Sequence, residues 1–162
     1  MHVDTVTETE LRGLRRRRPE VTGAVLAGRD GLLISSDLPA TDATHLAALA
    51  AVSYGVGHQV ADTVRGGSFR EAVVHTSTSC VITYPAGRHA LLTLVTEAGT
   101  DLEGLHEEAR AVAERAGAAV DSQRVGATPV PEVHAVLTTR TPVGALARRR
   151  PGATTDWGRS PL

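Results

Sequence analysis

The chain has 162 residues, a length typical of one domain with room for a substantial core. Its formal net charge of −1 produces no strong field, and aromatic residues make up only 2% of the chain. Bulk attraction to nucleic acid and a base-stacking platform are therefore not indicated.

The cysteine and histidine content limits the kinds of site that the chain can build. A single cysteine, Cys80, excludes an intramolecular disulfide and a zinc site with several cysteines. The seven histidines include no pair at the i,i+4 spacing of a helical metal site, so we predict no metal and no cofactor. No apolar run approaches the roughly 18 residues of a membrane helix, and residues 1–10 lack the apolar core of a signal peptide. We therefore expect a cytoplasmic protein that does not insert into a membrane.

The first predicted element is a short helix over residues 7–18. Thr7 and Glu10 have the spacing of a capping box, and Pro19 ends the segment. Four consecutive arginines, residues 15–18, close the helix. They could bind phosphate or an acidic partner, but cations at a helix C-terminus also complement the helix dipole and stay solvated, and we favour this second interpretation.

Residues 23–36 predict a β-hairpin. Two apolar runs are separated by a turn that contains Asp30-Gly31, and glycine accepts the positive φ that such a turn requires. The chain then enters a long helix over residues 42–65, with Thr41 or Asp42 as the expected N-cap. Gly66 and the glycine that follows it are expected to end this helix.

The helix over residues 42–65 is the element around which we expect the rest of the chain to be organised. Its larger apolar side chains share one helical face, and most of the remaining positions are small rather than charged. Gly55 and Gly57 each cost about 1 kcal/mol relative to alanine, which predicts a close contact that requires them. The helix is thus buried on more than one side, either in the core of a monomer or against a second copy of itself.

Three strands and a third helix follow. The strands are expected over residues 69–75, 79–84 and 89–96, and they are apolar on both faces, which favours a sheet covered by helices on each side. Thr100 and Glu103 form a second capping-box spacing, and Gly117 is the expected end of the last helix. The predicted order is α-β-β-α-β-β-β-α.

Composition changes at about residue 120. We expect one domain over residues 1–120 and a tail over 121–162 that is rich in proline and arginine and largely disordered alone. Residues 132–139 could form an added strand, and residues 143–150 a short basic peptide. Either could dock on a partner, and the tail could equally be dispensable.

Three stretches of the chain resemble segments of a known protein family. They are the hairpin GAVLAGRDGLLISS, the alanine-rich helix after it and the segment GSFREAVVHTSTSCVITYPAGRHALLTLVTE. Over about residues 7–120 the chain resembles the roadblock family of dynein light chain-related proteins, particularly its bacterial members. The resemblance implies an α+β fold: a five-stranded antiparallel sheet with the long helix on one face and the two terminal helices on the other.

The same resemblance implies a homodimer, joined through the central helix and through one edge of the sheet. Residues 69–75 would supply that edge. Carried over by position, the helix contact would use Leu46, Leu49, Ala50, Ser53, Val56, Gly57 and Val60.

The function implied by the resemblance is that of a regulatory scaffold without chemistry of its own. Bacterial members commonly act on Ras-like small GTPases, and many look to be encoded beside a sensor-kinase-like protein. We therefore expect the chain to bind and modulate a small GTPase in a bacterial signalling complex. Arg65 and Arg70, which flank the Gly-Gly turn, are the candidate partner-binding residues.

Two other classes of function compete with this one. The chain lacks a GxxxxGK[ST] loop, a GxGxxG after a strand and any lysine, which excludes Walker-type and Schiff-base chemistry. Cys80 with His75 or His89 could form a small thiol enzyme, although a cysteine in a strand's apolar alternation usually behaves as a buried hydrophobe. An adaptor that uses the arginines at 15–18 and 148–150 could bind nucleic acid, but neither cluster accompanies a recognition helix.

Overall fold

The computed structural model describes residues 3–126. Its elements, in chain order, are α1 (Val3–Arg17), β1 (Val21–Gly28), β2 (Leu33–Ser36), α2 (Ala40–Thr63), β3 (Ala72–His75), β4 (Ser79–Ala86), β5 (Ala90–Glu97) and α3 (Leu102–Gly126). This confirms the predicted order of three helices and five strands.

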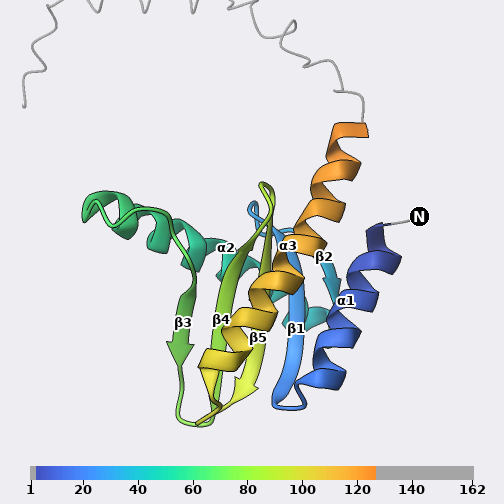
Figure 1. Cartoon of the computed structure of the whole chain (residues 1–162), viewed down its shortest axis with the longest axis horizontal. Coiled ribbons are helices and arrows are strands. Elements are labelled where there is room, and N and C mark those ends of the chain that lie inside the picture. The colour runs from blue at the N-terminus through green and yellow to red at the C-terminus, as the bar shows by residue number, and fades with distance from the viewer. Residues whose placement is uncertain (1–2, 127–162) are drawn as a thin grey trace, which may run out of the picture. The chain divides into compact units, whose positions relative to one another are not determined.

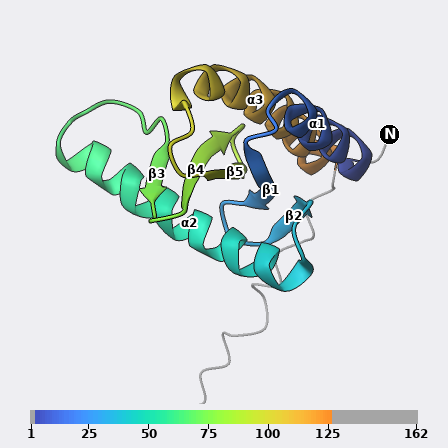
Figure 2. The same cartoon turned by 90° about the horizontal axis from the view of Figure 1, so that it is seen from below.

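The five strands form one antiparallel sheet in the order β2-β1-β5-β4-β3 (Figure 1). Strands β1, β5 and β4 occupy its centre, and most of their residues are buried, as expected for strands that are apolar on both faces. Figure 2 shows α2 on one face of the sheet and α1 with α3 on the other. The predicted α+β fold is therefore confirmed for the single chain.

The main core lies between the sheet and the pair of helices α1 and α3. Tyr84 is the largest of its fully buried side chains, and its hydroxyl lies 2.8 Å from Nδ1 of His106 on α3. This hydrogen bond satisfies the one polar atom that the ring carries into the core. The other large members of this core are Leu11, Leu14, Val21, Leu26, Ile82, Leu92, Leu94, Leu105 and Val112.

A second, smaller core lies between the sheet and α2. Ala43 and Ala47 of α2 contact Val25 and Ala27 of β1, and Leu38 and Leu46 pack against this cluster. Because the helix presents alanines to the sheet, its axis can approach the strands closely. The larger side chains of α2 therefore lie on another side of the helix.

The helix starts differ from the predicted capping residues. Helix α1 begins at Val3, so Thr7 lies within it and is fully buried, and its predicted capping role is wrong. The N-cap of α2 is Pro39, without a side-chain cap, whereas Thr41 was one of the expected caps. At the start of α3, the carboxylate of Asp101 accepts a hydrogen bond from the Glu103 N–H at 3.1 Å. The Thr100 hydroxyl instead donates to the Glu97 carbonyl.

The last helix continues past Gly117 to Gly126, so the predicted end at Gly117 is wrong. The physical reason is a close contact with the β4–β5 hairpin. A Cβ at Gly117 would overlap backbone atoms of Ala86 and Gly87, so this glycine lets the helix pass directly over the turn. Residues 121–126 therefore belong to α3, and the remainder of the predicted tail, 127–162, lies outside the described residues.

Candidate functional site

Helix α2 exposes a continuous apolar stripe. It consists of Leu49, Val52, Val56 and Val60 on the helix and Val64 directly after it, and each is between 54% and 66% exposed. Their spacing of three and four residues places them on one side of the helix. We call these five residues the α2 stripe. A contiguous apolar patch of this kind on a single chain usually marks an interaction surface.

The stripe is exposed because other residues of α2 meet the sheet. Ala43, Ala47 and Ala50 are buried against the strands, so the side of the helix that carries the valines points elsewhere. The C-terminal half of α2 also extends past the edge strand β3, as both Figure 1 and Figure 2 show.

An aromatic cluster fixes the position of this projecting half. The Tyr54 ring meets Phe69 edge-on at a centroid distance of 5.3 Å, and the Arg29 guanidinium carbon lies 4.6 Å from the Tyr54 centroid. Tyr54 thus links α2 to the β1–β2 turn and to the segment before β3. Phe69 also packs directly on Gly57, which has no space for a side chain. The stripe is therefore held on a braced helix rather than on a freely moving end.

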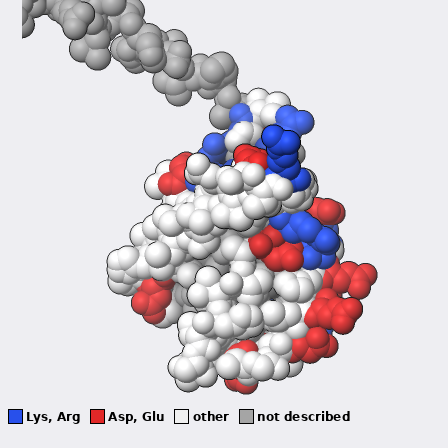
Figure 3. Space-filling view, turned by 90° about the vertical axis from the view of Figure 1, so that its left-hand side faces the viewer, with Lys and Arg blue, Asp and Glu red and all other residues white. Residues whose placement is uncertain are grey.

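The edge of the sheet beside this helix is also open. Within residues 3–126, strand β3 pairs only with β4, and its Val73 and Val74 are 37% and 50% exposed. The strand is shorter than predicted, because residues 69–71 do not join the sheet. Figure 3 shows this side of the molecule, where charged side chains are sparse over the central part of the face and gather mainly toward one margin. The α2 stripe and the β3 edge together form the candidate interaction surface.

The predicted helix contact is only partly available on this surface. Leu49, Val56 and Val60 belong to the α2 stripe, and Ser53 is half-buried beside them. Leu46 is half-buried and packs on the smaller core. Ala50 is 2% exposed. Gly57 is half-buried, with Phe69 in the space that a side chain would occupy. In the single chain Ala50 thus faces the sheet rather than the surface, and the contact between subunits stays a prediction.

Sequence reasoning missed one central member of the stripe and the cluster that supports it. Val52 follows Leu49 by three residues, and this helical spacing was a usable signal. The aromatic cluster gave no such signal, because Arg29, Tyr54 and Phe69 come from three separate elements.

Arg65 ends α2 in an unusual backbone conformation. Its φ is +54°, in the left-handed region that favours glycine. The Gly66 N–H donates to the Ala61 carbonyl at 2.8 Å, and the Arg65 N–H donates to the Asp62 carbonyl at 3.2 Å. This is the Schellman pattern, with arginine where glycine is usual. The side chain of Arg65 is exposed just beyond the α2 stripe.

Arg70 lies on the other side of the Gly-Gly turn. It lines a small cavity of about 200 Å³ with Phe69, Pro85, Arg110 and Glu114. Arg110 is itself bound to the carboxylate of Glu71 at 2.8 Å. Within residues 3–126, no ion-pair partner is recorded for the guanidinium of Arg65 or of Arg70. Both side chains can therefore meet a partner without first breaking an internal ion pair.

The residues considered for a thiol enzyme do not form a catalytic arrangement. Cys80 is 2% exposed on β4, and burial raises the pKa of its thiol, which disfavours the reactive thiolate. His75 is its exposed cross-strand neighbour on β3. His89 lies at the β4–β5 turn, where its Nδ1 is 2.7 Å from Asp121.

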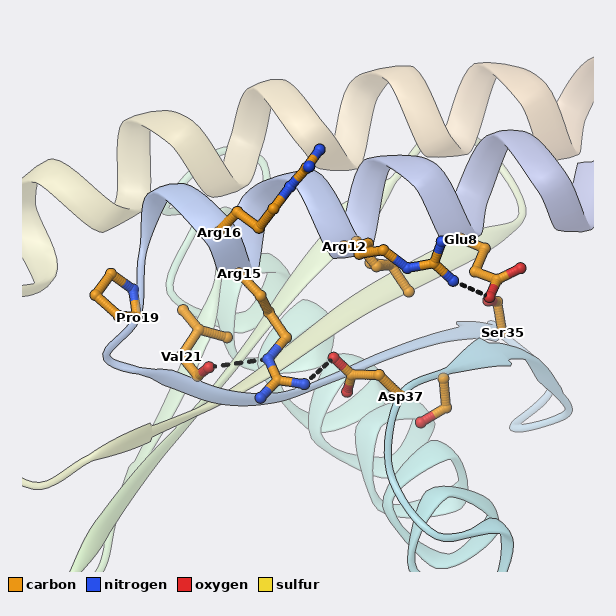
Figure 4. Close-up of a pocket in the computed structure, with 10 residues that line it drawn as sticks. Glu8, Arg12, Arg15, Arg16, Pro19, Val21, Ser35 and Asp37 are labelled. Atoms are coloured by element: carbon orange, nitrogen blue, oxygen red, sulfur yellow. Dashed lines mark hydrogen bonds and ion pairs between the residues drawn. The ribbon is translucent and has the colours of Figure 1, made fainter.

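Most of the arginines at 15–18 have internal structural roles. Arg15 donates to the Val21 carbonyl at 3.2 Å and to the Asp37 carboxylate at 2.8 Å (Figure 4). Arg17 and Arg18 both bind Glu108 of α3. Burial raises the pKa of Glu108, but these two hydrogen bonds outweigh it and the net pKa is lowered. The arginines at 148–150 lie outside the described residues.

The described part of the chain lacks two other kinds of feature. Among residues 3–126, no group of three or more histidine, cysteine, aspartate and glutamate side chains is arranged to hold a metal ion. None of the helices in that range has both the length and the hydropathy that a membrane crossing requires.

The comparisons with known proteins agree with this architecture. No curated protein matches the chain. Among solved structures, the Roadblock/LC7 domain from Streptomyces avermitilis is 28% identical, with a TM-score of 0.63 over 72% of this chain and 95% of that one. A structure described as MglB with a tetrameric arrangement is 20% identical, with a TM-score of 0.67 over 75% of this chain and 93% of that one.

A third similar structure is the gliding protein MglB from Thermus thermophilus. It is 19% identical, with a TM-score of 0.66 over 75% of this chain and 93% of that one. At this identity the two MglB structures establish a common fold. The model of the Roadblock/LC7 domain matches residues 7–96, which is more than half of the chain. The chain therefore belongs to the Roadblock/LC7 domain family.

Proposed function

We propose that the chain is a non-catalytic, homodimeric scaffold that binds and modulates a Ras-like small GTPase in a bacterial signalling complex. Membership of the Roadblock/LC7 family supports a regulatory role, because bacterial members of this family commonly act on such GTPases. A sensor-kinase-like protein is the second partner that the family resemblance favours. The motifs of nucleotide-binding enzymes are missing from the sequence, which is consistent with a scaffold.

The observation that carries the proposal is the α2 stripe. Burying the exposed parts of its five side chains contributes on the order of 1 kcal/mol each, and a two-fold contact buries both copies. The resulting total of several kcal/mol favours association over exposure to water. The similar MglB structure with a tetrameric arrangement supports self-association as a property of this fold.

A two-fold pairing can use the helix and the strand together. If the α2 stripes of two copies meet, the exposed β3 edges lie beside the same contact, and antiparallel pairing of β3 with its copy continues the sheet. The paired surface then carries Arg65 and Arg70 from both subunits. Such a composite surface gives a small domain enough area to hold a protein partner.

The first experiment measures solution mass by light scattering for the wild type and for Leu49→Arg. We expect the wild type near twice 16.9 kDa, and the variant near the monomer mass with an unchanged circular dichroism spectrum. Thr44→Arg is the matched control, because Thr44 is exposed on the same helix but lies off the α2 stripe. A folded wild-type monomer, or a Leu49→Arg dimer, would contradict the proposed pairing.

A second experiment tests the GTPase directly. Ras-like GTPases encoded beside this chain are loaded with GDP or a GTP analogue, and binding and hydrolysis are measured with the dimer. We expect a nucleotide-dependent interaction that Arg65→Ala combined with Arg70→Ala weakens. Arg88→Ala is the control, since Arg88 is exposed on the distant β4–β5 turn. Unchanged binding in the double variant would remove both arginines from the contact.

A further inference from the structure

We propose that the groove between α1 and the edge strand β2 binds an extended acidic segment of a partner protein, which joins the sheet as an added strand. This groove lies at the end of the sheet opposite β3. The proposal is therefore independent of pairing through the α2 stripe, and each can fail without the other.

The groove is a cavity of about 470 Å³ with a mixed lining. Buried Leu11 and Val21 form its apolar floor. One wall comes from α1 and the other from β2 and the residue after it, as Figure 4 shows. The polar residues that line it are Glu8, Arg12, Arg15, Arg16, Ser35, Ser36 and Asp37.

The outer edge of β2 is open for backbone pairing. Within residues 3–126, β2 is the last strand of the sheet and pairs only with β1. The Asp37 N–H donates to the Ala24 carbonyl at 3.2 Å, and the register continues with Ser36 opposite Val25. Along an antiparallel edge strand, the backbone N–H and C=O of successive residues point alternately toward the neighbouring strand and away from it. Asp37 points its N–H toward β1, so Ser36 points its N–H and C=O away from β1. An extended segment can bind these groups from outside.

The charged side chains of the groove determine which kind of extended segment can bind there. The pair Arg15–Asp37 is part of the fold, since Arg15 also holds the Val21 carbonyl. Arg12 pairs with Glu8 across one turn of α1, with both side chains more than half exposed, and such pairs contribute little and exchange readily. In the described part of the chain, no partner is recorded for Arg16, which lies on α1 one turn after Arg12. Figure 4 shows the Arg16 side chain directed away from β2, so the Arg12 guanidinium is the one available to acidic side chains in the groove.

Because β2 is short, binding at its edge depends strongly on the charged side chains of the groove. Strand β2 has four residues, and its register shifts between Leu26 and Ala27 of β1. So short and irregular an edge offers few backbone hydrogen bonds, and such edges discourage non-specific pairing. A segment with acidic side chains at alternate positions places all of them on the face toward α1.

Charge also argues against the two other occupants. Residues 127–162 of this chain carry five arginines and two acidic residues, so their composition as a whole does not match the groove. Residues 132–139 contain Glu132 and no arginine, and protection of the Ser36 amide without peptide and independent of protein concentration would assign the groove to them instead. A second copy that paired β2 with β2 would bring two sets of the same arginines together. The occupant favoured by the groove is therefore an acidic segment of another protein.

The test uses nuclear magnetic resonance of the full chain with a blocked octapeptide of alternating glutamate and valine, at low ionic strength. We expect the peptide to shift and protect the Ser36 amide, whereas a peptide of alternating lysine and valine does not bind. Arg12→Glu should weaken binding of the glutamate peptide about fivefold and should favour the lysine peptide instead. Arg88→Glu, the same charge change on the β4–β5 turn, should leave the affinity unchanged.

Several outcomes would overturn the proposal. One is an unperturbed Ser36 amide at millimolar glutamate peptide, and another is equal binding of both peptides. A third is protection of Ser36 that rises with protein concentration in the absence of peptide, which would show a second copy at this edge. The two proposals are tested separately by Leu49→Arg. A monomeric Leu49→Arg variant that still binds the peptide agrees with both proposals. A Leu49→Arg dimer that binds the peptide contradicts only the proposed α2 pairing.

Discussion

Gly57 and Phe69 lie in direct contact, with no space between them for a side chain on the helix. A Cβ at Gly57 would overlap ring atoms Cδ2 and Cε2 of Phe69, whereas a Cβ at Gly55 would meet nothing within 4 Å. Two glycines of one helix therefore have different roles. Gly57 lets the segment before β3 pack closely on α2, whereas no contact in the described part of the chain requires a glycine at Gly55.

Alanine substitution should separate these two glycines. Gly57→Ala should lower the free energy of unfolding by about 1–2 kcal/mol, because the Phe69 ring must move. Gly55→Ala should raise it by about 0.5–1 kcal/mol through higher helix propensity. Urea unfolding at one protein concentration measures both. Equal changes in the two variants would contradict the contact between Gly57 and Phe69.

Arg65→Gly should stabilise the protein. Arginine at a φ of +54° carries a steric cost of about 1–2 kcal/mol that glycine does not. The free energy of unfolding should therefore rise by about 1 kcal/mol in thermal or chemical denaturation. Arg65→Ala serves as the control, because alanine retains most of that cost. If both variants are equally stable, the left-handed conformation is not maintained in solution.

Stability should depend on Asp121 in a pH-dependent way. Burial raises the pKa of this carboxyl, but hydrogen bonds from the Arg88 N–H and from His89 outweigh it and lower the pKa below its ordinary value of 3.8. The stabilisation is thus complete above the unfolded-state pKa and is lost as pH falls through the folded-state pKa. Asp121→Asn should be less stable than the wild type at pH 7, and the difference should shrink as pH falls below 3.8 and through the lowered folded-state pKa.

The control for that experiment is Glu107→Gln, which removes one charge from an exposed position on the same helix. Its stability should follow the wild type across the whole range. A deficit of Asp121→Asn that persists unchanged in acid would point to lost packing rather than to the ionised carboxylate.

Cys80 should be unreactive in the folded protein. Its side chain is buried, and burial raises the pKa of the thiol. A thiol-disulfide exchange reagent should react at least about 100-fold more slowly with the native chain than in urea, since reaction requires opening of the fold. Rapid native labelling, or loss of partner binding in Cys80→Ala, would return the thiol to consideration as a functional group.

The order of elements was predictable because each strand and helix has a clear local pattern, such as the Asp30-Gly31 turn. The errors arise where a distant contact overrides such a pattern. Gly117 has the local character of a helix end, but the β4–β5 turn packs on it and the helix continues. Thr7 has the local character of a cap, yet the helix starts earlier and buries it.

The candidate surface was predictable to a similar degree. Helical periodicity identifies which residues of α2 share a side, so Leu49, Val56 and Val60 were found. Periodicity does not show which side meets the chain's own sheet, and Ala50 was therefore placed on the wrong one. The groove at Arg12 lies between α1 and β2, and no local sequence pattern predicts a contact between elements that far apart.

The two sides of α2 are under different constraints. Its alanines fit against the sheet, so larger side chains there would disturb the fold itself. Within residues 3–126 the α2 stripe is exposed rather than packed on the sheet, so substitutions along it should leave the folded subunit intact while altering the proposed pairing. If the proposed pairing holds, a few changes on this one side of the helix after duplication of the coding sequence can convert a self-pairing protein into two chains that recognise only each other.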